Sequence, residues 1–285
     1  MNGRTGMRRT MTLALPSLAL LVGLSPLHGE IIYGLVGTTG LVRFDSTLPG
    51  TITTIGMVSG LKNGETLLGI DFRPATGGLY ALGSGSDLYT INTGTAVATQ
   101  VGSSGAFTLS GTNFGFDFNP TVDRIRVVSN SGQNLRLNPN DGTLVATDGN
   151  LSPAGNIAGA AYTNNFLGAA TTTLYDIDAT AGTLLIQNPP NNGTLTVVGS
   201  LGAPVNGSDV GFDISGSTGT AYAALPGGLY TVNLNTGAAT LAGTFSNGIV
   251  VRDISVQPVP EPGTVALVGL GVAAAIMGRK RLVSS

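Results

Sequence analysis

The chain of 285 residues contains no cysteine and no tryptophan, and its single histidine, His28, lies in a segment that we expect to be removed. Without cysteine there is no disulfide framework, thiol nucleophile or cysteine-ligated zinc site. Without a histidine in the mature chain, a Ser–His–Asp triad and imidazole acid–base chemistry are excluded as well. Charged residues are scarce, at 10%. Carboxylates are therefore the main groups left for acid–base catalysis.

Basic residues are concentrated at the two ends of the chain. The six that lie there, of 13 in total, are Arg4, Arg8, Arg9, Arg279, Lys280 and Arg281. Between Glu30 and Glu261 the sequence holds 7 basic and 15 acidic residues, a net charge of −8. Such an acidic domain lacks the basic surface that DNA and RNA require, so nucleic acid is excluded as a partner.

Residues 1–29 have the pattern of a secretory signal peptide. Three arginines precede an apolar run from Met11 to Leu24, and small or helix-breaking residues follow up to Gly29. The apolar run is shorter than the roughly 18 residues that a membrane-spanning helix needs. We therefore expect export and cleavage near Gly29.

Residues 259–285 contain three elements in a fixed order. A Pro260-Glu261-Pro262 tripeptide is followed by an apolar run over residues 264–277 and by the basic cluster Arg279-Lys280-Arg281. This pattern resembles the PEP-CTERM sorting signal of bacteria that make extracellular polysaccharide. The resemblance implies that a membrane-embedded exosortase cuts near the tripeptide and releases the protein or transfers it at the cell surface.

The physical chemistry of the tail agrees with this resemblance. A basic cluster after an apolar helix stays in the cytoplasm, which holds the bulk of the chain outside. Fourteen residues, 264–277, are short for a permanent anchor, so a transient transmembrane helix is favoured over an ordinary tail anchor.

The middle of the chain is a repeat. Five related segments begin at residues 67, 113, 157, 209 and 249, with the sequences LLGIDFRP, NFGFDFNP, IAGAAYTN, DVGFDISG and IVVRDISV. Their aligned positions, spaced by 46, 44, 52 and 40 residues, are Asp71, Asp117, Ala161, Asp213 and Asp253. This period suits a four-stranded propeller blade.

The two ends of the repeat region complement each other. Residues 30–37, 40–46 and 50–56 match the second, third and fourth strands of a unit, and the last segment is a first strand alone. Pairing them completes a fifth unit and removes two open sheet edges. The sequence therefore predicts an all-β, five-bladed propeller over residues 30–258, with a five-unit β-solenoid or a sandwich as the alternative.

Residues 31–256 also resemble a bacterial family of secreted domains of unknown function that often carries this sorting tail. The recurring G-[IF]-D-[FI] segments and the TLYDID…QNPPN stretch carry the resemblance. It implies no activity and no catalytic residues.

The recurring aspartates, Asp71, Asp117, Asp213 and Asp253, are candidates for two roles. A carboxylate on a packed blade is expected to be partly buried, so it must find hydrogen-bond donors. In the first role each aspartate accepts backbone N–H groups and locks one blade to the next. In the second role they surround the axis as oxygen ligands of Ca²⁺, the one cofactor that the sequence suggests.

Asp176 and Asp178 lie two residues apart, so they share one face of a strand. Two carboxylates held about 5 to 10 Å apart could cleave a glycosidic bond. A role in a strand-end turn or in a cation contact is the more ordinary alternative.

Three arginines, Arg124, Arg126 and Arg136, lie close together in the sequence. They either pair with local acids, such as Asp123 and Asp141, or contact an anionic polysaccharide through bidentate hydrogen bonds.

Together these features predict an exported protein of the cell surface, outer envelope or extracellular matrix. Its expected partners are the secretion machinery, exosortase and extracellular polysaccharide, and its C-terminal helix contacts the membrane before processing. We interpret it as a non-enzymatic binding or structural module without assigned catalytic residues. The alternative is a carboxylate-based, Ca²⁺-dependent hydrolase or lyase that acts on extracellular polysaccharide.

Overall fold

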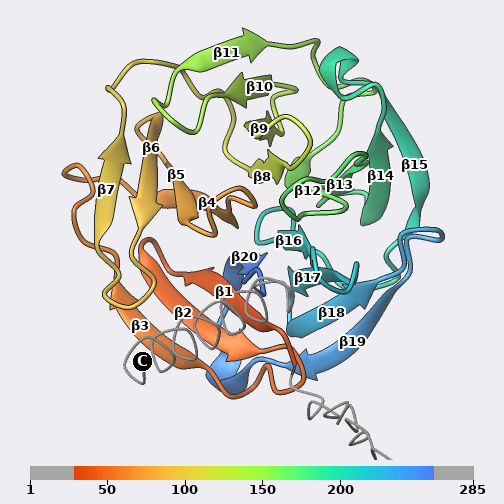
Figure 1. The fold of residues 1–285 in the computed structure, drawn as a ribbon. Helices are drawn as coiled ribbons and strands as arrows, with labels where there is room; N and C mark the ends of the chain where they lie inside the picture. Colours follow the sequence, from red (N-terminus) through yellow and green to blue (C-terminus); the bar gives the residue numbers. More distant parts are fainter. Residues whose placement is uncertain (1–28, 260–285) are drawn as a thin grey trace, which may run out of the picture.

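The computed structural model describes residues 29–259. Within that range the chain forms five four-stranded antiparallel sheets, arranged as blades around one axis (Figure 1). The first strand of each blade lies nearest the axis and the fourth lies at the rim. The predicted five-bladed β-propeller is confirmed, and the solenoid and sandwich alternatives are excluded.

The blades are numbered in chain order, and their strands are given from the axis outward. Blade 1 contains β20 (Val251–Val256), β1 (Ile31–Val36), β2 (Gly40–Asp45) and β3 (Thr53–Met57). Blade 2 contains β4 (Leu67–Phe72), β5 (Leu79–Gly83), β6 (Asp87–Ile91) and β7 (Ala98–Val101). Blade 3 contains β8 (Phe114–Asn119), β9 (Arg124–Ser129), β10 (Asn134–Leu137) and β11 (Leu144–Thr147). Blade 4 contains β12 (Ile157–Tyr162), β13 (Leu174–Asp178), β14 (Thr183–Gln187) and β15 (Leu195–Ser200). Blade 5 contains β16 (Gly211–Ile214), β17 (Ala221–Leu225), β18 (Gly228–Val232) and β19 (Ala239–Thr244). Two short 3₁₀ helices, η1 (Pro190–Asn192) and η2 (Ser246–Gly248), lie in loops.

Blade 1 is built from both ends of the described chain. The last strand, β20, pairs antiparallel with β1, with Ile32 opposite Val256 and Gly34 opposite Ile254. The main-chain N–H of Gln257 then donates to the carbonyl oxygen of Ile31 at 2.8 Å. This pairing satisfies the inner edge of β1, so the ring is closed as the sequence predicts.

The inner strands of neighbouring blades approach each other closely, which explains the glycine of the recurring G-x-D motif. A Cβ atom at Gly115 would lie 2.6 Å from the Cβ of Ala160 in the next blade. At Gly211 it would lie 2.7 Å from the Cα of Asp253. Only glycine permits this approach without moving a blade.

The hydrophobic core is divided among the interfaces between blades. Tyr33 of blade 1 packs edge-on against Phe72 of blade 2, with ring centroids 5.3 Å apart. Tyr80 of blade 2 packs in the same way against Phe118 of blade 3, at 5.1 Å. Each blade is therefore held mainly by its two neighbours.

The predicted signal peptide and the apolar run 264–277 lie outside the described residues. Among residues 29–259, no helix has the length and apolar character needed to cross a membrane.

Candidate functional site

The aspartates of the inner strands bind the main chain of the next blade. The carboxylate of Asp71 accepts a hydrogen bond from the N–H of Phe118 at 2.8 Å. Asp117 accepts from the N–H of Tyr162 at 3.0 Å, and Asp213 accepts from the N–H of Val256 at 2.6 Å. All three side chains are buried. These bonds support the role in which each aspartate locks its blade to the next.

In blade 1 this position is occupied by Ser255, and the predicted alignment of Asp253 with the other aspartates is wrong by two residues. The Oγ of Ser255 accepts from the N–H of Phe72 at 3.0 Å and donates to Asp71 at 2.7 Å. Asp253 stands where the other inner strands have glycine, and it accepts from the N–H of Ile70 at 2.6 Å.

The remaining three carboxylates form a tight group at the axis. One oxygen of each of Asp71, Asp117 and Asp213 lies within 4.8 Å of the others. Burial, followed by repulsion from a neighbouring carboxylate, raises the pKa of Asp71 and Asp117 well above the ordinary value. Burial also raises the pKa of Asp213, to about 6. Protonation of one of these carboxyl groups, or a bound cation, would relieve the repulsion within this group.

Calcium binding by this group stays a prediction, and calorimetry tests it. Ca²⁺ takes about six to eight oxygen ligands, of which Asp71, Asp117 and Asp213 would supply a part. If the group binds Ca²⁺, titrating the purified propeller, residues 30–259, with Ca²⁺ up to millimolar concentration produces a heat of binding. The substitution Asp117→Asn is then expected to abolish this heat. An absence of heat in this range would leave these carboxylates a purely structural role.

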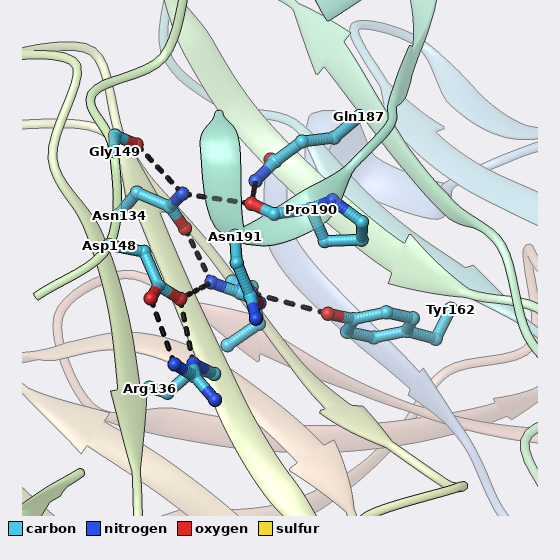
Figure 2. A network of polar contacts seen from close by, with 9 residues as sticks. Asn134, Arg136, Asp148, Gly149, Tyr162, Gln187, Pro190 and Asn191 are labelled. Atoms are coloured by element: carbon cyan, nitrogen blue, oxygen red, sulfur yellow. Dashed lines mark hydrogen bonds and ion pairs between the residues drawn. The ribbon is translucent and has the colours of Figure 1, made fainter. Parts of the chain in front are cut away.

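A second polar site lies between blades 3 and 4, and it is centred on a buried arginine. Arg126 of β9 is 2% exposed. Its Nη1 donates to Asn134 and to Asp148, both at 2.7 Å. Its Nε donates to the hydroxyl of Tyr162 at 3.2 Å, and its Nη2 donates to the side-chain oxygen of Asn191 at 2.8 Å. Figure 2 shows how these partners converge from both blades.

Asp148 joins two of the three arginines. Arg136 donates two hydrogen bonds to its carboxylate, at 2.7 and 2.9 Å (Figure 2). The same carboxylate accepts the hydrogen bond from Arg126. Although burial opposes it, hydrogen bonds from Arg136 and Arg126 lower the pKa of Asp148 below its ordinary value. Asp148 is therefore ionised at neutral pH and neutralises one of the two arginines.

Two of the three arginines pair with a local acid, as the sequence predicts, but that acid is Asp148 and not Asp123 or Asp141. Asp123 accepts hydrogen bonds from Arg73 of blade 2, and Asp141 accepts from the hydroxyl and N–H of Thr143. The guanidinium of Arg124 donates to main-chain oxygens of residues 122 and 123.

The three arginines border one cavity of about 250 Å³, here called the arginine pocket. Its lining residues are Asn119, Val122, Arg124, Ile125, Arg126, Arg136, Tyr162, Pro189, Pro190 and Asn191. The carbonyl oxygen of Pro190 accepts from Asn134 at 3.0 Å and from Gln187 at 2.6 Å (Figure 2). These two bonds fix the proline-rich segment of blade 4 as one wall of the pocket.

Asp176 and Asp178 lie in different environments. Asp178 accepts from the N–H groups of Thr180 and Ala181 at 2.8 and 2.9 Å, which is the strand-end turn role. Asp176 is 0% exposed, and neither of its oxygens has a hydrogen-bond partner among the described residues. Burial raises the pKa of Asp176 to about 8, although Arg126 opposes the shift. This pair therefore lends no support to carboxylate catalysis.

Tyr162 and Asn191 line the arginine pocket and Asp148 bonds two of its arginines, and none of the three was predicted from the sequence as a site residue. One signal was present for Asn191, because Asn188-Pro189-Pro190-Asn191 interrupts the regular repeat of the fourth unit. A second was Arg126, a charged residue between the apolar residues Ile125 and Val127 of its strand. A charge at such a position requires buried partners.

Fold and sites together define a closed five-bladed propeller that carries an axial carboxylate group and an arginine pocket between two blades. The chain belongs to the family described as a domain of unknown function (DUF4394), whose model matches residues 40–255. The PEP-CTERM protein-sorting motif matches residues 258–281. Both resemblances predicted from the sequence are confirmed, and the motif marks the chain as exported, directed to the cell surface and processed by exosortase.

Solved structures of similar fold are distant in sequence. A structural genomics protein of unknown function from Bacteroides thetaiotaomicron is 15% identical, with a TM-score of 0.47, and the match covers 81% of this chain and 65% of that one. A chain of the nidogen/laminin complex is 12% identical, with a TM-score of 0.45 and coverages of 80% and 98%. Glutaminyl cyclase from Myxococcus xanthus is 12% identical, with a TM-score of 0.42 and coverages of 67% and 88%. No curated protein matches the chain.

Proposed function

We propose that the protein is a propeller delivered to the cell surface, where it acts as a binding or structural module of the envelope or extracellular matrix. The observation that carries this proposal is the position of the sorting motif relative to the closed ring. The strand β20 ends at Val256, and the main chain of Gln257 still bonds to Ile31. The Pro-Glu-Pro tripeptide begins at Pro260, just beyond this last contact. Cleavage near the tripeptide therefore leaves every strand of the propeller in place.

Each segment of the chain has a separate role in export, sorting or binding. Residues 1–29 direct export and are removed. Residues 264–277 hold the chain in the membrane until exosortase cuts. The processed propeller is then free to meet extracellular polysaccharide.

Neutralising the basic cluster of the tail tests this proposal. The combined substitution Arg279→Gln, Lys280→Gln and Arg281→Gln removes the charges that keep the end of the tail in the cytoplasm. We expect most of the protein to remain uncleaved, whereas wild type is found mainly as the shorter form at the surface. Immunoblots of cell fractions, with intact-mass measurement, follow both forms.

A matched control is Lys62→Gln, which also removes a positive charge but lies in the propeller. It is expected to be processed normally. Normal processing of the tail variant as well would contradict the sorting step of the proposal.

A further inference from the structure

Blade 3 departs from the repeat on its second strand. On the second strand, the residue opposite the ring position is tyrosine in four blades and Arg126 in blade 3; the tyrosines are Tyr33, Tyr80, Tyr175 and Tyr222. On the third strand, Arg136 lies opposite Arg126. Blade 1 also has an arginine there, the exposed Arg43, whereas blades 2, 4 and 5 have the uncharged residues Thr90, Ile186 and Thr231. Only blade 3 has arginines on both strands. A repeat needs the same packing in every blade, so a departure in one blade points to a task that only this blade has.

The charge balance of the arginine pocket is positive within an acidic domain. Three of the seven basic residues between positions 30 and 261 line it. The carboxylate of Asp148, which contacts Arg126 and Arg136, neutralises one charge. Arg124 forms hydrogen bonds to main-chain oxygens and none to a carboxylate. An anionic group that enters the pocket therefore gains charge-assisted hydrogen bonds that the protein itself does not use.

The arginines differ in burial and in hydrogen-bond partners, as the residues of a preformed binding site do. Arg126 is buried and holds Tyr162 and Asn191 in place across the blade interface. Arg136 keeps 29% of its side chain exposed beside the cavity. A guanidinium already oriented by a carboxylate loses little side-chain entropy when it binds a second planar anion.

The other walls of the pocket restrict the size and shape of the ligand. Val122 and Pro189, which are exposed, give it apolar surface next to the guanidinium groups. Its volume of about 250 Å³ is below the range of roughly 300 to 1,000 Å³ that is usual for drug-sized ligands. A single ring that bears an anionic group suits these walls better than a larger molecule.

We propose that the arginine pocket binds the carboxylate of an acidic sugar residue, and that the propeller thereby recognises acidic extracellular polysaccharide. This inference rests on the proposed function only for the extracellular location that brings such a polymer to the protein. The carboxylate faces Arg124 and Arg136, and the ring of the sugar lies against the apolar wall. Because the contacts are ionic, the affinity falls as salt concentration rises.

Calorimetry on the purified propeller, residues 30–259, tests the inference. The probes are short oligomers of galacturonate, neutral glucose oligomers of the same length, inorganic phosphate and sulfate. Wild type is expected to bind the uronate oligomer at low salt and to bind the neutral oligomer at least tenfold more weakly. Arg124→Gln and Arg136→Gln are each expected to weaken uronate binding about tenfold, since each removes a charged donor.

The repeat itself offers a matched control. Arg43 of blade 1 lies opposite Tyr33, at the position that Arg136 has in blade 3, but it is exposed and far from the pocket. Arg43→Gln makes the same charge change and is expected to alter the affinity less than twofold. The three variants should melt within a few degrees of wild type, because Arg126 still holds Asp148.

Two results would overturn the inference. The first is equal affinity of wild type, Arg124→Gln and Arg136→Gln for the uronate oligomer, or no binding at all. The second is that phosphate or sulfate binds as tightly as the uronate and displaces it, which would leave a simple anion site. Neither result bears on sorting, which the cell-fractionation experiment measures separately.

Discussion

Removing β20 is expected to abolish the folded propeller, whereas removing only the sorting tail is expected to leave it intact. A chain of residues 30–248 lacks the inner strand of blade 1. A chain of residues 30–259 keeps every hydrogen bond that closes the ring. We expect the longer chain to melt in one cooperative transition and the shorter one to show none, by calorimetry and circular dichroism.

The size of the effect follows from what β20 buries. Val251, Ile254 and Val256 are each 5% exposed or less. Full burial of such side chains contributes about 1.5 to 3 kcal/mol each, so these three alone approach the roughly 5 to 15 kcal/mol of a typical folded domain. Deletion also leaves the carboxylate of Asp213 without the N–H of Val256.

Point substitutions in β20 measure what the packing of its side chains contributes to stability while the strand itself is kept. Ile254→Ala, at a residue that is 1% exposed, is expected to lower the free energy of unfolding by about 2 to 5 kcal/mol. The control is Val250→Ala, at a neighbouring residue that is 51% exposed and should cost well under 1 kcal/mol. A chain of residues 30–248 that melted cooperatively at the wild-type temperature would show that closure does not hold the ring together.

The fold could be predicted because its signals are local and repeated. Three of the five inner strands, β4, β8 and β16, have a glycine two residues before an aspartate, and the physical reason for each residue is the same in all three. The glycine lets adjacent strands approach, and the aspartate reaches the N–H of the next strand. The unmatched strands at the two ends then left one way to complete the last sheet.

The details of the sites could not be predicted, because they depend on register and on distant partners. Residues 253–255 read Asp-Ile-Ser, as do residues 213–215, so local similarity placed Asp253 in the ring. Pairing with β1 instead puts Ser255 opposite Tyr33, at the ring position. In the same way Arg126 pairs with Asp148, 22 residues away, rather than with nearby Asp123. No spacing rule in the sequence selects one carboxylate over the other.

The other large effect that we expect concerns pH and the buried carboxyl group of Asp176. Burial raises the pKa of Asp176 to about 8 in the folded state, against about 4 for an unperturbed aspartate in the unfolded chain. Between these values the folded protein keeps the proton and the unfolded chain releases it. The stabilising contribution of the protonated group is therefore complete below about pH 4 and is lost as pH rises to about 8. At about 1.4 kcal/mol per pH unit, the loss amounts to at most about 6 kcal/mol.

Replacing Asp176 by asparagine should remove this pH dependence, because the amide cannot ionise. We expect Asp176→Asn and wild type to have similar free energies of unfolding near pH 4, and the variant to be more stable by several kcal/mol at pH 9. The other buried carboxylates titrate in both proteins, so the difference between the two urea-unfolding curves isolates Asp176. Asp178→Asn, which makes the same charge change two residues along β13, is expected to follow the wild-type pH profile. If the free energies of unfolding of Asp176→Asn and wild type instead change with pH in parallel, the ionisation of Asp176 is not linked to unfolding. The Asp176 carboxylate would then be stabilised in the folded state by a hydrogen-bond donor or by solvent.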